Sequence, residues 1–189
     1  YKELLNFCTV DLSAFYFDIR KDVLYCDPRN SEKRKSCILV LNILLESLVK
    51  WFAPILSFTS EEIFRLINKN AKSIHLEKFI NLPKGFKNLK LAENWTELKK
   101  IRDICNVSIE SKRAKKEIGS SLEASLIITL NDKKFKKFQN IDFSELCITS
   151  FAKIERSDEE DISVKSEKAK GVKCPVCWKI NINGCDRHP

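Results

Sequence analysis

The residues best suited to chemistry gather near the end of this chain. Cys174 and Cys177 form a C-x-x-C pair, and after seven intervening residues Cys185 and His188 form a C-x-x-H pair. A C-x-x-C turn directs two thiolates at one point, and zinc takes four such ligands in a tetrahedral arrangement. The spacing therefore predicts a knuckle that binds one zinc ion through these four side chains.

Three other interpretations compete with the zinc site. A redox C-x-x-C motif needs a thioredoxin-like strand and helix around it, and too little chain is available for one. A disulfide is disfavoured because nothing at the start of the chain reads as a secretory signal, which predicts a cytoplasmic, reducing location. Chance clustering of three cysteines in so short a segment is also disfavoured. The ligands that complete the pair of Cys174 and Cys177 stay open: they are Cys185 and His188, or residues beyond Pro189.

Two further features suggest contact with a nucleic acid: a tryptophan beside the predicted zinc site and a group of cations earlier in the chain. Trp178 directly follows a predicted ligand, and it either fills the small core of the knuckle or stacks on an unpaired base. Lys112, Arg113, Lys115 and Lys116 place four cations within five residues. They form either a solvated helix end that complements the helix dipole or a contact to phosphates. The net charge of +8 fits an anionic partner.

Apolar residues recur every three or four positions in several segments, which predicts helices. The stripes are Leu4, Cys8, Leu12, Phe15, Ile19 and Val23, then Ile38, Leu41, Leu45, Leu48 and Phe52, and later Leu98, Ile101, Cys105 and Ile109. Thr59 is expected to cap a third helix, with Glu62 completing a capping box. Because the connections between the first three helices are short, these helices are expected to pack as an antiparallel bundle.

The pattern changes after Gly119. Residues 125–130 are typical of a strand, Asn131 and Asp132 can cap a short helix, and a second strand is expected around 146–154. The predicted fold class is mainly α: an antiparallel helical bundle, then a small α+β unit and a C-terminal zinc knuckle. The predicted domain boundaries are 1–120 for the bundle, 121–156 for the α+β unit, 157–171 for a charged linker and 172–189 for the knuckle.

The chain begins with Tyr1 and contains no Met, which predicts that it is a piece of a longer protein. Its longest apolar run, 37–45, is too short to span a membrane and is interrupted by Asn42, so no membrane partner is expected.

Several motifs, in the same order, resemble a known family. They are residues 15–25 (FYFDIRKDVLY), 40–45 (VLNILL), 51–62 (WFAPILSFTSEE), 73–76 (SIHL), 118–124 (IGSSLEA) and 173–178 (KCPVCW). The first three segments resemble the anticodon-binding helices of class I aminoacyl-tRNA synthetases, including the valyl and leucyl enzymes. The last two resemble bacterial isoleucyl-tRNA synthetases in particular. The resemblance covers nearly the whole chain.

The resemblance implies an anticodon-binding bundle of the class I synthetase type and tRNA(Ile) as the partner. It implies tRNA contacts by Arg20, Lys21, Lys112, Arg113, Lys116 and Trp178, with zinc as the cofactor. The parent enzyme would be monomeric, would use ATP to attach isoleucine to tRNA, and would hydrolyse misacylated valine in a separate domain. Neither the HIGH nor the KMSKS signature of class I catalytic domains occurs in this sequence, so the chain itself is not expected to be catalytic. Val176 stands where relatives often carry a basic residue.

Overall fold

The computed structural model describes residues 1–188, which fall into two compact units. One unit consists of Tyr1–Cys26 together with the chain from Leu89 onward, and the other is Asp27–Asn88. The predicted class is confirmed: helices precede a small sheet, and a Cys/His cluster follows it. The division differs from the expected boundaries, because the segment 1–120 contributes to both units.

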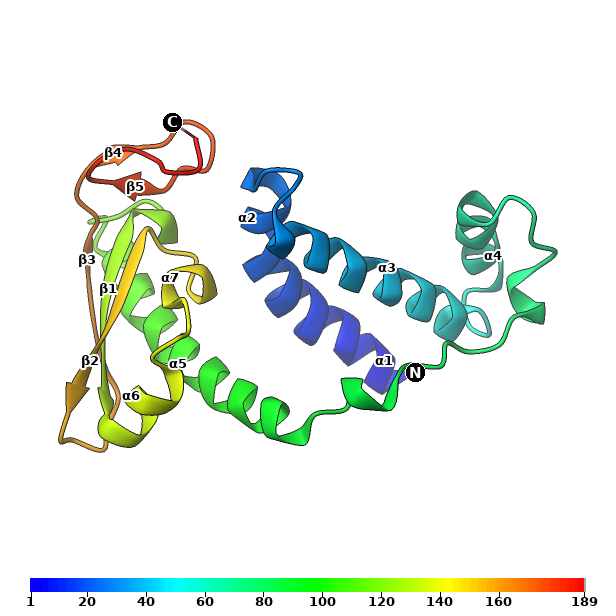
Figure 1. The fold of residues 1–189 in the computed structure, drawn as a ribbon, viewed down its shortest axis with the longest axis horizontal. Helices are drawn as coiled ribbons and strands as arrows, with labels where there is room; N and C mark the ends of the chain where they lie inside the picture. The colour runs from blue at the N-terminus through cyan, green and yellow to red at the C-terminus, as the bar shows by residue number, and fades with distance from the viewer. Residues whose placement is uncertain (189) are drawn as a thin grey trace. The chain divides into compact units, whose positions relative to one another are not determined.

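The first unit opens with one long helical run (Figure 1). It consists of α1 (Lys2–Asn6), a π-helical stretch η1 (Phe7–Phe17) and α2 (Asp18–Cys26). Three residues of the predicted stripe, Leu12, Ile19 and Val23, are buried. The run ends before the Asp27-Pro28 pair, as expected, because proline disfavours the helical conformation of the residue before it.

The core of this unit lies between α5 (Leu89–Ala114) and a three-stranded sheet. The predicted stripe of α5 is confirmed: Leu98, Ile101, Cys105 and Ile109 are all buried. In the sheet, β1 (Ala124–Asn131) lies between β2 (Phe151–Ser157), which is parallel to it, and β3 (Ser163–Lys168), which is antiparallel. Alternate residues of β1 are fully buried, which explains its strand pattern.

The crossover from β1 to β2 contains α6 (Asp132–Phe138) and α7 (Phe143–Leu146). Asn131 caps α6, as predicted, because its side-chain oxygen accepts a hydrogen bond from the Lys134 N–H at 2.9 Å. The second strand begins later than predicted, at Phe151, because residues 143–146 form α7.

The predicted linker over 157–171 differs from the structure, since β3 lies within it and completes the sheet. The side chain that β3 buries against α5 is polar: the hydroxyl groups of Ser166 and Ser108 lie 2.7 Å apart. Such a serine pair satisfies its own hydrogen bonds but removes the apolar alternation from which a strand is recognised.

The second unit is helical. It contains α3 (Glu32–Phe52), α4 (Ser57–Ile67) and two short 3₁₀ turns, η2 (Ile74–Leu76) and η3 (Lys84–Phe86). The predicted capping box is wrong, because α4 begins before Thr59 and no side chain caps it. The neighbouring Glu61 instead accepts hydrogen bonds from the Ser73 hydroxyl and the Ile74 N–H, which fixes the chain after α4. The α3 stripe is partly wrong, since Ile38 and Leu45 are exposed.

A 3₁₀ turn η4 (Ser121–Glu123) precedes β1, and the chain closes with a small ribbon of β4 (Val172–Lys173) and β5 (Ile180–Asn181). None of the helices in residues 1–188 combines the length and the apolar character that a membrane crossing needs.

Candidate functional site

The knuckle is built on the β4–β5 ribbon, in which Val172 pairs with Asn181 and Lys173 with Ile180. Gly171 enters the ribbon with φ +129°, and a Cβ atom there would lie 2.3 Å from the Asn181 carbonyl oxygen. Only glycine fits such an approach without displacing backbone. The ribbon thus holds both ends of the C-x-x-C turn.

Within this turn, backbone groups close around Cys174. Its N–H donates to the Lys179 carbonyl at 2.9 Å, and its carbonyl accepts from the Trp178 N–H at 3.0 Å. The Val176 N–H points at the Cys174 sulfur, 3.4 Å away. These bonds place Cys174 and Cys177 on one side of the turn, where both are buried.

The structure brings together all four predicted ligands. One donor atom from each of Cys174, Cys177, Cys185 and His188 lies within 4.8 Å of the other three. The sulfurs of Cys177 and Cys185 are 3.6 Å apart, and His188 Nδ1 lies 3.3 Å from the Cys185 sulfur and 3.6 Å from that of Cys174. In a tetrahedral zinc site, bonds of about 2.3 Å to sulfur and 2.0 Å to nitrogen put neighbouring donors about 3.5–3.8 Å apart. The donor set therefore fits a tetrahedral metal ion.

Hydrogen bonds favour the thiolate form of Cys174. The Cys177 N–H bonded to Cys174 lowers the pKa of that thiol to about 6, against the effect of burial, and the Val176 N–H adds to the shift. Burial raises the pKa of Cys177, while the hydrogen bond to Cys185 raises the pKa of His188. Cys174 is thus a thiolate at neutral pH, which is the form that binds a metal.

Trp178, which directly follows the second cysteine of the turn, lies at the surface. The residue is 60% exposed, and its backbone has φ +63°, in the left-handed region where non-glycine residues are uncommon. Of the two interpretations left open by the sequence, this exposure favours a surface role over a place in the knuckle core.

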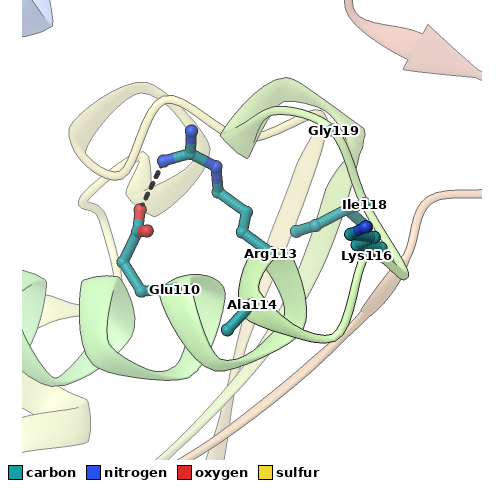
Figure 2. A pocket seen from close by; sticks show the side chains of 6 residues that line it. All are labelled: Glu110, Arg113, Ala114, Lys116, Ile118 and Gly119. Atoms are coloured by element: carbon teal, nitrogen blue, oxygen red, sulfur yellow. Dashed lines mark hydrogen bonds and ion pairs between the residues drawn. The ribbon is translucent and has the colours of Figure 1, made fainter.

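The basic residues at the end of α5 surround a shallow pocket lined by Glu110, Arg113, Ala114, Lys116, Ile118 and Gly119 (Figure 2). The helix ends at Ala114, so Lys116 lies in the turn beyond it and not on the helical stripe expected from the sequence. The Lys116 N–H donates to the Arg113 carbonyl and the Glu117 N–H to the Lys112 carbonyl, at 2.9 and 3.1 Å. This is a Schellman motif with Lys116, at φ +58°, in the position usually taken by glycine.

The other predicted tRNA contacts carry intramolecular partners. Lys112 pairs with Glu117 and Arg113 with Glu110, each at 2.7 Å. On α2, Lys21 pairs with Asp18 at 2.7 Å. These are exposed or half-exposed pairs, which contribute little and exchange readily for phosphate. Arg20 differs, because it pairs with Glu145 of α7 and is largely covered, so it also holds α2 to the α+β unit.

Sequence reasoning missed two contacts that tie the end of the knuckle to α2. The guanidinium of Arg187 pairs with Asp22, and His188 Nε2 lies 2.9 Å from the Cys26 carbonyl oxygen. No local signal connects these positions, since more than 160 residues separate them. Only the fold brings them together.

Residues 1–128 match the family described as the anticodon-binding domain of tRNA ligase. The chain belongs to this family. The match covers α1 to α5 and most of β1, and thus includes all the predicted tRNA contacts except Trp178.

Similarity to individual proteins extends over the knuckle as well. The chain is 69% identical over 188 residues to the isoleucine–tRNA ligase of Pelagibacter ubique, a match that covers 100% of this chain and 21% of that protein. It is 40% identical over 189 residues to that of Bartonella henselae, and 40% identical over 196 residues to that of Mesorhizobium japonicum. These two matches cover 94% and 96% of the chain and 20% of each relative. The chain thus spans about a fifth of the length of the relatives it matches.

Proposed function

We propose that this chain is the anticodon-binding and knuckle region of an isoleucine–tRNA ligase, and that it grips the anticodon stem-loop of tRNA(Ile). The single observation that carries the proposal is the 69% identity to such an enzyme along the whole chain, knuckle included. The complete enzyme attaches isoleucine to tRNA with ATP in the cytoplasm, acts as a monomer and removes misacylated valine in a separate domain. Binding alone separates these two side chains only by about 10–200-fold, so hydrolysis supplies the rest.

The metal of the knuckle is zinc in this proposal. Three thiolates and one imidazole form a soft to borderline donor set, and a tetrahedral arrangement suits zinc better than cations that prefer oxygen ligands. When bound, zinc supplies no chemistry here beyond cross-linking the turn. The four ligands leave no position for water or substrate, which is typical of a structural site.

The proposed RNA contacts lie in three places: the end of α5, helix α2 and the knuckle. Lys112, Arg113 and Lys116 meet phosphates at the end of α5, and Arg20 and Lys21 do so on α2. Trp178 offers an exposed ring on which an unpaired base can stack. Lys116 and Trp178 are supported by a shared feature: both are exposed and both hold a left-handed backbone conformation, which persists where surrounding structure enforces it and is often found at functional positions.

The experiment that tests the proposal compares tRNAs that differ only in the anticodon. The 189-residue chain is titrated with a transcript of tRNA(Ile) and with the same transcript carrying a valine anticodon, at several salt concentrations. We expect binding of the isoleucine transcript to be at least tenfold tighter, with both affinities falling steeply as salt rises. Equal affinity for the two transcripts and for unrelated tRNAs would favour the alternative, a generic zinc-containing nucleic-acid-binding module.

A second comparison separates the synthetases from one another. If the region belonged to a valyl or leucyl enzyme, the transcript with the valine or leucine anticodon would bind better than tRNA(Ile). Isoleucine charging by the longer parent enzyme would decide the same question independently.

A further inference from the structure

The imidazole of His188 has a polar partner on each side. Nδ1 faces the sulfurs of Cys185 and Cys174, at 3.3 and 3.6 Å, while Nε2 lies 2.9 Å from the carbonyl oxygen of Cys26. A carbonyl oxygen only accepts hydrogen bonds, so Nε2 must carry the proton and donate it. In the neutral ring, Nδ1 then presents its lone pair to the cysteines, which is the form a metal ligand needs.

The residue before His188 makes a second link to the same helix. Arg187 NH1 lies 2.8 Å from Asp22 Oδ2, and NH2 lies 3.1 Å from Oδ1, so the pair is bidentate. The two side chains are only 27% and 19% exposed. Burial alone would raise the pKa of Asp22, but the hydrogen bonds and charge of Arg187, with the charge of Lys179, hold it below its ordinary value. The carboxylate is therefore charged at neutral pH.

Both acceptors stand on one face of α2. Asp22 and Cys26 are four residues apart, which is about one helical turn. Cys26 is also the last residue of the helix. The adjacent residues 187 and 188 thus meet two acceptors one helical turn apart.

We propose that the metal site is a clasp, in which metal binding and the seating of the knuckle on the end of α2 are one coupled event. This rests on the metal site of the proposed function. A metal ion on Nδ1 fixes the ring and points the Nε2 proton at Cys26; conversely, the bonds to Asp22 and Cys26 orient the ring for the metal. Such coupling is reciprocal. Among the four ligands, only the imidazole has a second polar atom, so a cysteine at this position would hold the metal without the clasp.

The first experiment measures the affinity for zinc by competition with a chromophoric chelator. Asp22→Ala removes the partner of Arg187 without touching a ligand, and we expect its affinity for zinc to be about 10–100-fold weaker, as for other residues that support a metal ligand. Asp11→Ala is the matched control. It removes a carboxylate from the same helical run, paired with Lys99 at 3.0 Å, and should bind zinc like the unaltered chain.

The second experiment separates ligation from the clasp. In the unaltered chain, adding zinc should slow amide hydrogen exchange in residues 18–26, because the end of α2 frays less. His188→Cys should still bind one zinc through four cysteines, but zinc should slow exchange in α2 less than in the unaltered chain, because only the link between Arg187 and Asp22 remains. If this variant fails to bind zinc, the affinity of Asp22→Ala decides the question alone.

The outcomes separate the two proposals. Zinc binding by the unaltered chain, together with equal affinities in Asp22→Ala and Asp11→Ala, would overturn the clasp and leave the metal site. The same holds if His188→Cys binds zinc and zinc slows exchange in α2 as much as it does in the unaltered chain. An unaltered chain that takes up no zinc would overturn the metal site and the clasp together.

Discussion

The end of α5 and the C-x-x-C turn both hold a residue in the left-handed backbone conformation, but different contacts stabilise the two turns. Each turn places an exposed, non-glycine residue in the left-handed conformation, Lys116 in the first and Trp178 in the second. The first turn is closed by two backbone hydrogen bonds and a surface ion pair. The second adds four converging side-chain donors. The strain at Trp178 is therefore held by a cluster that a cation can cross-link, whereas that at Lys116 is held by backbone hydrogen bonds and one surface ion pair.

A third residue shows what the conformation does not prove. Ile148 also has positive φ, at +55°, and ends α7 through bonds from its N–H to Glu145 and from the Thr149 N–H to Ser144. Its side chain is half-buried, so this turn serves packing. Positive φ marks a strained turn, and only exposure of a suitable side chain makes it a candidate RNA contact.

Removing the metal should produce the largest difference between the two turns, because only the knuckle depends on it. Apparent binding energies of structural zinc sites are on the order of 10 kcal/mol. We expect one zinc per chain by metal analysis, and loss of zinc with Cys174→Ser or a chelator. The knuckle should then exchange its amides rapidly, while residues 112–118 remain as before. Cys8→Ser, which changes a cysteine outside the cluster, should keep its zinc. A purified chain that is metal-free and has an ordered knuckle would contradict the site.

Lowering the pH should have the second-largest effect, because the two turns should lose stability at different pH values. Zinc must displace the protons of its ligands, so its affinity falls as the pH falls, roughly tenfold per pH unit for each proton displaced. Because the pKa of Cys174 is about 6 and that of His188 is raised, the loss should steepen near pH 6.

The α5 turn should respond only at lower pH. Lys112, through its hydrogen bond, lowers the pKa of Glu117 from 4.5, against the opposing effect of burial. A carboxylate with a lowered pKa contributes its stability fully above pH 4.5 and loses it as the pH falls through the folded value. Chelator competition and NMR shifts of residues 112–118, measured across this range, would check the order. If both turns lost their structure at the same pH, their stabilities would not be independent of each other.

Trp178→Ala should have a smaller effect, confined to RNA. Stacking on an aromatic side chain is worth about 1–3 kcal/mol per base, which predicts roughly five- to 150-fold weaker tRNA binding. Since Trp178 is 60% exposed, zinc affinity and thermal stability should change little. Val176→Ala, at a nearby residue that is 56% exposed, is the control and should leave tRNA binding nearly unchanged. A large fall in melting temperature with Trp178→Ala would instead place the ring in the knuckle core.

The sequence predicted those parts of the molecule in which local pattern and packing agree. The α5 stripe, strand β1 and the Asn131 cap of α6 were all found, because each is encoded within a few neighbouring residues. The Cys/His cluster follows from local pattern in the same way: the C-x-x-C and C-x-x-H turns are local, and the structure brings their four side chains together.

The misses arise where polar side chains replace apolar ones or where distant segments meet. Strand β3 was taken for a linker because its buried contact is a serine pair. The capping box failed because α4 begins at Ser57, which places Thr59 inside the first turn and not at its N-cap. The contact between Asp22 and Arg187 has no local signature at all, since only the tertiary fold creates it. The contacts to tRNA remain predictions.

Lys116→Gly should have the smallest effect, a change in stability and in tRNA affinity at the α5 turn alone. Relief of the left-handed strain gives about 1–2 kcal/mol, and the greater freedom of glycine in the unfolded chain removes about half of it. We expect the variant to be more stable by about 1 kcal/mol in denaturant titrations, yet to bind tRNA more weakly, with the salt dependence reduced by about one counterion. Lys115→Gly is the matched control, because it removes the same charge one residue earlier, at a position without positive φ. It should bring no gain in stability. If Lys116→Gly were more stable and bound tRNA as before, the lysine would be a tolerated defect in a helix cap, and the likeness between the two turns would end at the backbone.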